Sequence, residues 1–250
     1  MPRKSSRTQL AYERLRADLL ACRLKPGEPL RLAELCKRLA VSLGAVREAL
    51  SRLTSEGLVS AEPQHGFRAA AVSAPDLKDL AGVRSEIEGA CLRRAIAVGD
   101  LAWEARIVSA YHQLSRTPVQ AADDAERLSD AYALVHARFH EELASACDSP
   151  WLLRLRAMLF AQSERYRRLT LPLERHDRDR NREHRQLMDA VLARDADRAV
   201  SLMKAHVEKT TQILLTGIVG LDKSGDRRRA VAARSRTASP VRRARPVSPA

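Results

Sequence analysis

Aromatic and loop-forming residues are scarce in this chain of 250 residues. Phe, Trp and Tyr together make up 4% of it, and there are only 10 glycines and 11 prolines. β-Sandwiches and β-barrels need aromatic strands joined by many Gly- and Pro-containing turns, so the composition argues against both. Leu, Ala, Arg and Glu dominate instead, and these are strong helix formers. We therefore expect a mainly α protein.

We expect no disulfide framework, secretory leader or membrane span in this chain. Its four cysteines are scattered and form no Cys-x-x-Cys pair, which indicates free thiols in a reducing compartment. The N-terminal sequence MPRKSSRTQL is charged and has no apolar stretch of the kind a signal peptide carries. The longest apolar stretch, residues 210–221, is about half as long as a membrane-spanning helix. We expect a cytoplasmic protein with no membrane partner.

Basic residues are concentrated at the two ends of the chain, whose formal net charge is +13. Residues 1–72 carry 13 Lys and Arg against 7 Asp and Glu, and residues 222–250 carry 9 against 2. Residues 73–221 are balanced, with 22 of each sign. Basic ends around a neutral middle suggest a nucleic-acid partner, because the phosphate backbone attracts such segments.

Residues 1–72 have the pattern of a small DNA-binding domain. Helical periodicity predicts helices from Leu10 to Leu20, Leu32 to Leu39 and Leu43 to Ser55. Two short segments on either side of a turn at Pro63 to Gly66 predict a β-hairpin. Three short helices and a hairpin in a basic segment are typical of a winged helix-turn-helix domain.

Residues 73–221 predict an all-helical bundle. They form six amphipathic stretches with no strand pattern, at about 76–98, 101–115, 122–147, 150–170, 177–193 and 196–217. Residues 222–250 have almost no large apolar side chains, so we expect a disordered basic tail. That tail either raises non-specific DNA affinity or only solubilises the chain.

The third predicted helix is the candidate recognition helix. Its apolar stripe would face the core and comprises Val46, Ala49, Leu50 and Leu53. The residues left facing outward are Gly44, Arg47, Glu48, Ser51 and Arg52. Ser42 fits the N-cap of a helix whose N-terminus suits a phosphate, and Arg47 could reach a guanine edge or a phosphate. The alternative is that Arg47 and Glu48 belong to an ordinary solvated helix face.

The segment KPGEPL…LAELCKRLAVSLGAVREALSRLTSEGLV…HG closely resembles the DNA-binding domain of the GntR family of bacterial transcription regulators. The resemblance implies a double-stranded DNA operator as partner, with contacts from the start of the third helix and from the wing. The implied contact residues are Ser42, Gly44, Ala45, Arg47, His65 and Gly66, to which we add the outward Arg52. Leu43 stands where most members have Arg, and Arg31, further upstream, could compensate.

Four of the seven histidines are placed to form a metal site. His136 and His140 are four residues apart and project from one helix face. His184 and His206 lie near the start and end of the last two predicted helices, and an antiparallel pair can bring these points together. Four imidazoles from three helices suit Zn²⁺ or Ni²⁺, which bind nitrogen well. The alternative is that each histidine is simply packed or exposed.

Residues 76–215 resemble FCD, the effector domain of the FadR subfamily of GntR regulators, through FHEEL and EHRQLMDAVLARDADRAVSLMKAH. The family pattern is Asp or Asn, three residues, His, and later two histidines with 21 residues between them. His184 and His206 have that spacing, and His140 fits the first histidine. His136 occupies the Asp or Asn position, so the implied divalent-metal site loses its carboxylate. Six predicted helices rather than seven indicate the smaller, VanR-like type of FCD domain.

The same resemblance implies that Arg84, on the first helix of this domain, holds a small carboxylic-acid effector. A guanidinium can bind a carboxylate through two parallel hydrogen bonds. The alternative for Arg84 is an ordinary ion pair with Glu88, four residues along the helix.

We interpret the chain as a ligand-responsive bacterial transcription regulator, most simply a repressor. A homodimer would place one winged helix on each half-site of a palindromic operator. A carboxylic acid bound with a metal in the helical domain would shift the relative placement of the DNA-binding domains. Two alternatives are a regulator that responds to the metal itself and a metal-dependent helical enzyme. No acidic residue is clearly placed as a general base, so we predict no enzymatic activity.

Overall fold

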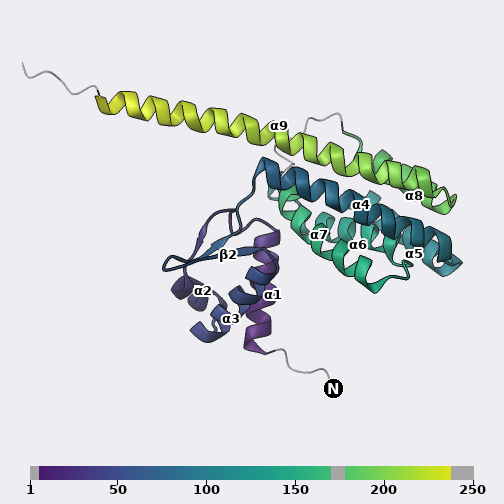
Figure 1. Ribbon diagram of the computed structural model, residues 1–250, viewed down its shortest axis with the longest axis horizontal. Helices are drawn as coiled ribbons and strands as arrows, with labels where there is room; N and C mark the ends of the chain where they lie inside the picture. Colours follow the sequence, from purple (N-terminus) through teal and green to yellow (C-terminus); the bar gives the residue numbers. More distant parts are fainter. Residues whose placement is uncertain (1–5, 170–177, 238–250) are drawn as a thin grey trace, which may run out of the picture.

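The structure is a computed structural model that describes residues 6–169 and 178–237, with side chains as far as residue 216. Figure 1 shows a small N-terminal body of helices and strands beside a larger body of helices. The two bodies have separate hydrophobic cores. The fold is mainly α, with a winged helix-turn-helix domain followed by a helical domain, as the sequence predicts.

The N-terminal domain contains three helices and a small sheet. Its elements are α1 (Arg7–Leu20), β1 (Pro29–Leu30), α2 (Leu32–Leu39), α3 (Leu43–Ser55), β2 (Val59–Glu62) and β3 (Gly66–Ala69). β3 is the central strand, antiparallel to both neighbours, and Phe67 pairs with Leu30 on one side and Ala61 on the other. The sequence does not predict β1, because two residues are too short to show a strand period.

The C-terminal domain contains six helices in the described part of the chain. They are α4 (Ala74–Val98), α5 (Leu101–Arg116), α6 (Asp130–Ala144), α7 (Pro150–Arg168), α8 (Arg180–Leu192) and α9 (Ala196–Thr237). α4 packs along both α7 and α9, α5 packs on α6, and α8 packs on α9 (Figure 1). Trp103, Phe139 and Leu143 are fully buried in the core that these helices share.

A β-hairpin interrupts the region predicted as one helix over residues 122–147. Strands β4 (Gln120–Ala121) and β5 (Asp124–Leu128) pair antiparallel, and α6 begins only at Asp130. Ser129 sets that start, since its hydroxyl accepts a hydrogen bond from the Tyr132 N–H at 3.3 Å. Only Leu128 of β5 is buried, so the strand lacks the alternating apolar pattern that sequence analysis depends on.

Helix α9 differs from the prediction at its C-terminal end. The sequence predicts disorder from Asp222, whereas the backbone continues as helix to Thr237. Figure 1 shows this extension running well beyond the rest of the helical domain. The segment is rich in Ala and Arg, which favour helix even where there is no core to bury. Residues 238–250 of the predicted tail lie outside the described residues. Within the residues described, no helix is both long and apolar enough to cross a membrane.

Candidate functional site

Helix α3 has the free surface expected of a recognition helix. It begins at Leu43 because Ser42 caps it, with the Ser42 hydroxyl accepting from the Ala45 N–H at 3.3 Å. No atom lies within 4 Å of the position where a Cβ on Gly44 would be. Arg47 is exposed one turn further on, and its guanidinium has no hydrogen bond or ion pair with any described residue. This face of α3 is therefore open to a ligand.

Two of the predicted DNA-contacting residues, Ala45 and Arg52, have contacts within the domain. The Ala45 side chain is only 8% exposed, because helical periodicity turns it inward with Val46. The Arg52 guanidinium lies 3.9 Å from the ring centroid of Tyr12 and donates a hydrogen bond to Gln9 Oε1 at 3.0 Å. Arg52 is exposed, as periodicity predicts, and its contacts with α1 are ones that periodicity cannot show. DNA contacts from Ala45 and Arg52 stay predictions.

The wing and the start of α2 are exposed. His65 lies at the tip of the hairpin, where its N–H donates to the Glu62 carbonyl at 3.1 Å. Gly66 has a φ of +83°, a left-handed conformation that a residue without Cβ adopts at little cost. Arg31 is exposed and forms a 3.2 Å ion pair with Glu34. DNA contacts from Arg31, His65 and Gly66 stay predictions.

Four histidines converge inside the helical domain. His136 and His140 come from α6, His184 from α8 and His206 from α9. One ring nitrogen from each lies within 4.8 Å of the corresponding nitrogens of the others. The ring centroids of His136 and His140 are 4.5 Å apart, and those of His184 and His206 are 4.9 Å apart. The spacing in the sequence therefore correctly predicts that these four side chains lie close together.

This histidine cluster is removed from water, and most of its buried ring nitrogens have no hydrogen-bond partner among the described residues. His136, His140 and His184 are 3%, 0% and 1% exposed. Burial lowers the pKa of all four imidazoles below the ordinary value, so the rings are neutral, which is the form that ligates a metal. Five buried ring nitrogens of these three residues have no hydrogen-bond partner among the described residues. An orphaned buried polar atom costs about 1–3 kcal/mol, so the cluster fits a metal cation that would bind one nitrogen of each ring.

Glu183 supports the cluster from outside, and the sequence analysis does not single it out. Its Oε2 lies 3.0 Å from His206 Nδ1, which leaves His206 Nε2 as the nitrogen available to a metal. Burial alone would raise the pKa of Glu183, but hydrogen bonds from His206, Arg178 and Lys209 lower it well below the ordinary value. The carboxylate is therefore ionised and holds the ring in place. Its position directly before His184 is the signal that could have identified it.

Arg84 belongs to a buried charge network beside the cluster. Arg84 Nε lies 3.4 Å from Glu88 Oε1, so the predicted i,i+4 pair exists. Arg156 of α7 binds the other oxygen of Glu88 at 2.7 Å and donates to the His140 carbonyl at 2.5 Å. Arg84 also lies over the Phe160 ring, 4.8 Å from its centroid. Two guanidinium groups thus share one carboxylate at 0% exposure, which leaves positive charge uncompensated next to the histidines.

Two small cavities adjoin the histidines. Arg84, His136 and His206 line one cavity of about 30 Å³. His136 and His206 also line a second, of about 20 Å³, together with Tyr132. The Tyr132 hydroxyl is buried and has no hydrogen-bond partner among the described residues. Each cavity has room for a water-sized group, so a larger ligand must displace side chains when it enters.

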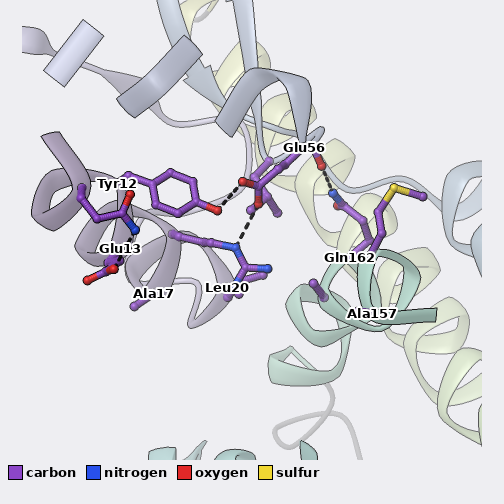
Figure 2. A pocket seen from close by; sticks show the side chains of 12 residues that line it. Tyr12, Glu13, Ala17, Leu20, Glu56, Ala157 and Gln162 are labelled. Atoms are coloured by element: carbon purple, nitrogen blue, oxygen red, sulfur yellow. Dashed lines mark hydrogen bonds and ion pairs between the residues drawn. The ribbon is translucent and has the colours of Figure 1, made fainter. Parts of the chain in front are cut away.

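A larger cleft of about 640 Å³ lies between α1 and α7, where the two domains meet (Figure 2). Glu56, the residue that ends α3, is at its centre. The Glu56 carboxylate accepts hydrogen bonds from the Tyr12 hydroxyl and from Arg16 Nε, the latter at 2.9 Å. The Glu56 carbonyl accepts from Gln162 of α7. α7 therefore contacts both the network under the histidines and the end of α3.

Two protein-family models match the chain, one for each domain. Residues 7–68 match the model of bacterial regulatory proteins of the gntR family. Residues 79–209 match the FCD domain. Together the two matches include the predicted DNA-contacting residues of the first domain and the histidine cluster and Arg84 of the second.

Curated relatives extend along most of the chain. The HTH-type transcriptional regulator BphR of Paraburkholderia xenovorans is 40% identical over 206 residues, covering 82% of this chain and 84% of BphR. The HTH-type transcriptional repressor GlaR of Escherichia coli is 36% identical over 214 residues, covering 84% of this chain and 96% of GlaR. Both names describe regulators of transcription.

Solved structures share the fold. A putative GntR transcriptional regulator from Rhodococcus sp. RHA1 has a TM-score of 0.68 at 23% identity, covering 84% of this chain and 98% of its own. E. coli McbR/YncC also has a TM-score of 0.68, at 21% identity, covering 86% and 100%. With both domains matched, the chain belongs to the GntR family of bacterial transcription regulators and carries an FCD domain.

Proposed function

We propose that this DNA-binding regulator is a repressor whose operator affinity is controlled by a small carboxylic acid bound beside a divalent metal. The single observation that supports it is the buried cluster of His136, His140, His184 and His206, with orphaned nitrogens, sharing a cavity with Arg84. The family consists of regulators and the chain is not an enzyme. Its target is chromosomal DNA, so we expect it to act in the cytoplasm.

The four histidines would hold the metal, and Zn²⁺ or Ni²⁺ suits an all-nitrogen set. When bound, the metal supplies an open position for a ligand oxygen. Arg84 would bind a carboxylate through its guanidinium, because Glu88 keeps Arg156 as a partner if Arg84 turns away. We favour the acid over the metal alone as the effector. The Arg84 guanidinium is buried at the cavity wall, and a positively charged group there has no role in holding a metal cation.

The operator would be palindromic and the regulator a homodimer. Two copies of α3 related by a two-fold axis read two half-sites one helical turn or more apart. An effector changes operator affinity only if it binds one arrangement of the two DNA-binding domains better than another. α7 can carry that preference, because it contacts the Arg84 network at Arg156 and the end of α3 at Gln162.

A gel-shift assay with DNA flanking the regulator's own gene tests the proposal. We expect a specific shift by the metal-loaded protein, relieved by one candidate carboxylic acid. That relief should disappear after chelation and in His140→Ala. His112→Ala is the matched control, because His112 is an exposed histidine on α5.

The metal-sensor alternative predicts a different outcome of the same assay. If the metal alone changes the shift and no acid relieves it, the metal is the effector. If neither metal nor acid changes a specific shift, the proposed control through the histidine cluster is wrong.

A further inference from the structure

Leu43 is an exposed apolar side chain in the first turn of the recognition helix. It is the first residue of α3 and is 49% exposed, although leucine is otherwise buried throughout this helix. The neighbouring residues Ser42 and Gly44 add no other apolar side chain to this turn. The Ser42 hydroxyl is engaged with the Ala45 N–H, and Gly44 has no side chain. The first turn of α3 therefore presents one isobutyl group to a partner.

The first turn of a recognition helix is the part that meets base edges in the major groove. Thymine is the one base that presents a methyl group there, while guanine, adenine and cytosine present hydrogen-bonding groups at their edges. Leucine can neither donate nor accept, so packing it on those polar edges would bury them unpaired. Packing it on a methyl group removes apolar surface from water on both sides.

We propose that Leu43 reads the 5-methyl group of a thymine in each half-site of the operator. Arg47 lies on the same face of α3, four residues further along, and would contact a neighbouring base or phosphate. The two side chains would have different roles. Arg47 supplies positive charge, and Leu43 selects A·T over the other base pairs. This inference rests on the DNA-binding assignment and is independent of the effector and the metal.

The experiment uses duplexes that the full-length protein selects from a random library. Each thymine of a selected duplex is replaced, one position at a time, by deoxyuridine, which lacks only the 5-methyl group. Competition gel shifts at one fixed salt concentration then give relative affinities. We expect one thymine per half-site at which the replacement weakens wild-type binding by about fourfold, the effect of losing one buried methyl group.

Leu43→Ala should bind the same duplexes more weakly and be insensitive to deoxyuridine at that position. Leu43→Arg should select guanine there, because Arg binds the guanine edge. Leu101→Ala is the matched control: Leu101 is an 81% exposed leucine on α5, and its variant should keep the wild-type sensitivity. Melting temperatures should be unchanged in all variants, since both positions are exposed.

Two results would overturn the inference. The first is wild-type binding that tolerates deoxyuridine at every thymine. The second is a Leu43→Ala variant that keeps the full sensitivity of the wild type. Either would mean that Leu43 is exposed for another reason, such as contact with another protein.

Discussion

Gln162 of α7 donates a hydrogen bond to the backbone carbonyl of Glu56, the C-cap residue of recognition helix α3 (Figure 2). A helix C-terminus has carbonyl groups without intrahelical partners, so this bond ties the end of α3 to the effector domain. Two turns earlier on α7, Arg156 binds Glu88 and the His140 carbonyl. One rigid helix thus contacts both the buried charge network and the DNA-binding domain.

Gln162→Ala should uncouple the two domains. We expect operator affinity without effector to stay within about threefold of wild type, because the substitution leaves the DNA-facing surface of α3 intact. The change in affinity caused by the effector should fall, because typical couplings of 1–3 kcal/mol depend on such shared contacts. Gel-shift titrations with and without effector measure both quantities. Gln113→Ala, at an exposed glutamine on α5, should leave the response unchanged. If Gln162→Ala keeps the full response to the effector, this hydrogen bond does not contribute to the coupling between the two domains.

Arg84→Met should abolish the response to a carboxylic acid while keeping the metal. Methionine fills much of the same space as arginine. Glu88 keeps its 2.7 Å ion pair with Arg156, so the buried carboxylate still has a positively charged partner. Isothermal titration with the acid, together with metal content by mass spectrometry, separates the two effects. Arg93→Met is the control, because Arg93 is an exposed arginine on the same helix. Acid binding of wild-type strength in Arg84→Met would exclude the predicted role of Arg84.

Removing the metal should lower the melting temperature. A ligand present at about 100 times its dissociation constant stabilises a protein by about 2.7 kcal/mol, which is roughly 5–10 °C for a chain of this size. Differential scanning calorimetry before and after chelation measures the difference. In His184→Ala the chelator should have no effect, whatever the variant's own stability. An identical chelator effect in wild type and His184→Ala would show that the metal binds elsewhere.

Alkaline pH should weaken the contact at the start of α4. Burial, with the Asp76 carboxylate 2.5 Å away, raises the pKa of the Tyr166 hydroxyl to about 12. The unfolded chain loses this proton near pH 10 and the folded chain keeps it, so the free energy of unfolding falls as pH rises from 10 to 12. One such group changes the free energy of unfolding by about 1.4 kcal/mol per pH unit. Urea titrations of wild type and Tyr166→Phe over this range should differ by that slope, and parallel curves would contradict the assignment.

Deleting residues 222–250 should weaken binding to every DNA sequence and flatten its dependence on salt. The deletion removes nine Lys and Arg, and each phosphate contact that they make releases counterions. Fluorescence anisotropy on operator and random duplexes at several salt concentrations measures both effects. Deleting residues 238–250 alone removes three of these basic residues and should have a smaller effect. An unchanged salt slope would mean that the segment only solubilises the chain.

Local sequence accounts well for the helices of the DNA-binding domain and for the four histidines that come together. α2 and α3 have the predicted bounds: Ala40 ends α2 in a left-handed conformation, Ser42 caps α3, and both act over only a few residues. The four histidines were identifiable because helical spacing fixes His136 and His140 on one face. The sequence predictions were wrong where local preference is weak. The β5 strand has polar residues on both faces. The segment after Asp222 has helix-forming residues but almost no large apolar ones, and it is helical to Thr237.

The sequence by itself determined the family, the helical fold and which histidines come together, since these follow from local motifs, helical periodicity and short spacings along the chain. Only the tertiary structure decided which polar groups share an environment. It placed Arg52 over Tyr12, Arg156 between Glu88 and His140, and Gln162 at the end of α3. These partners are far apart in the chain, and no periodicity encodes such pairs. They arise because α1 packs on α3, α4 packs on α7, and α7 packs on α1 across the two domains.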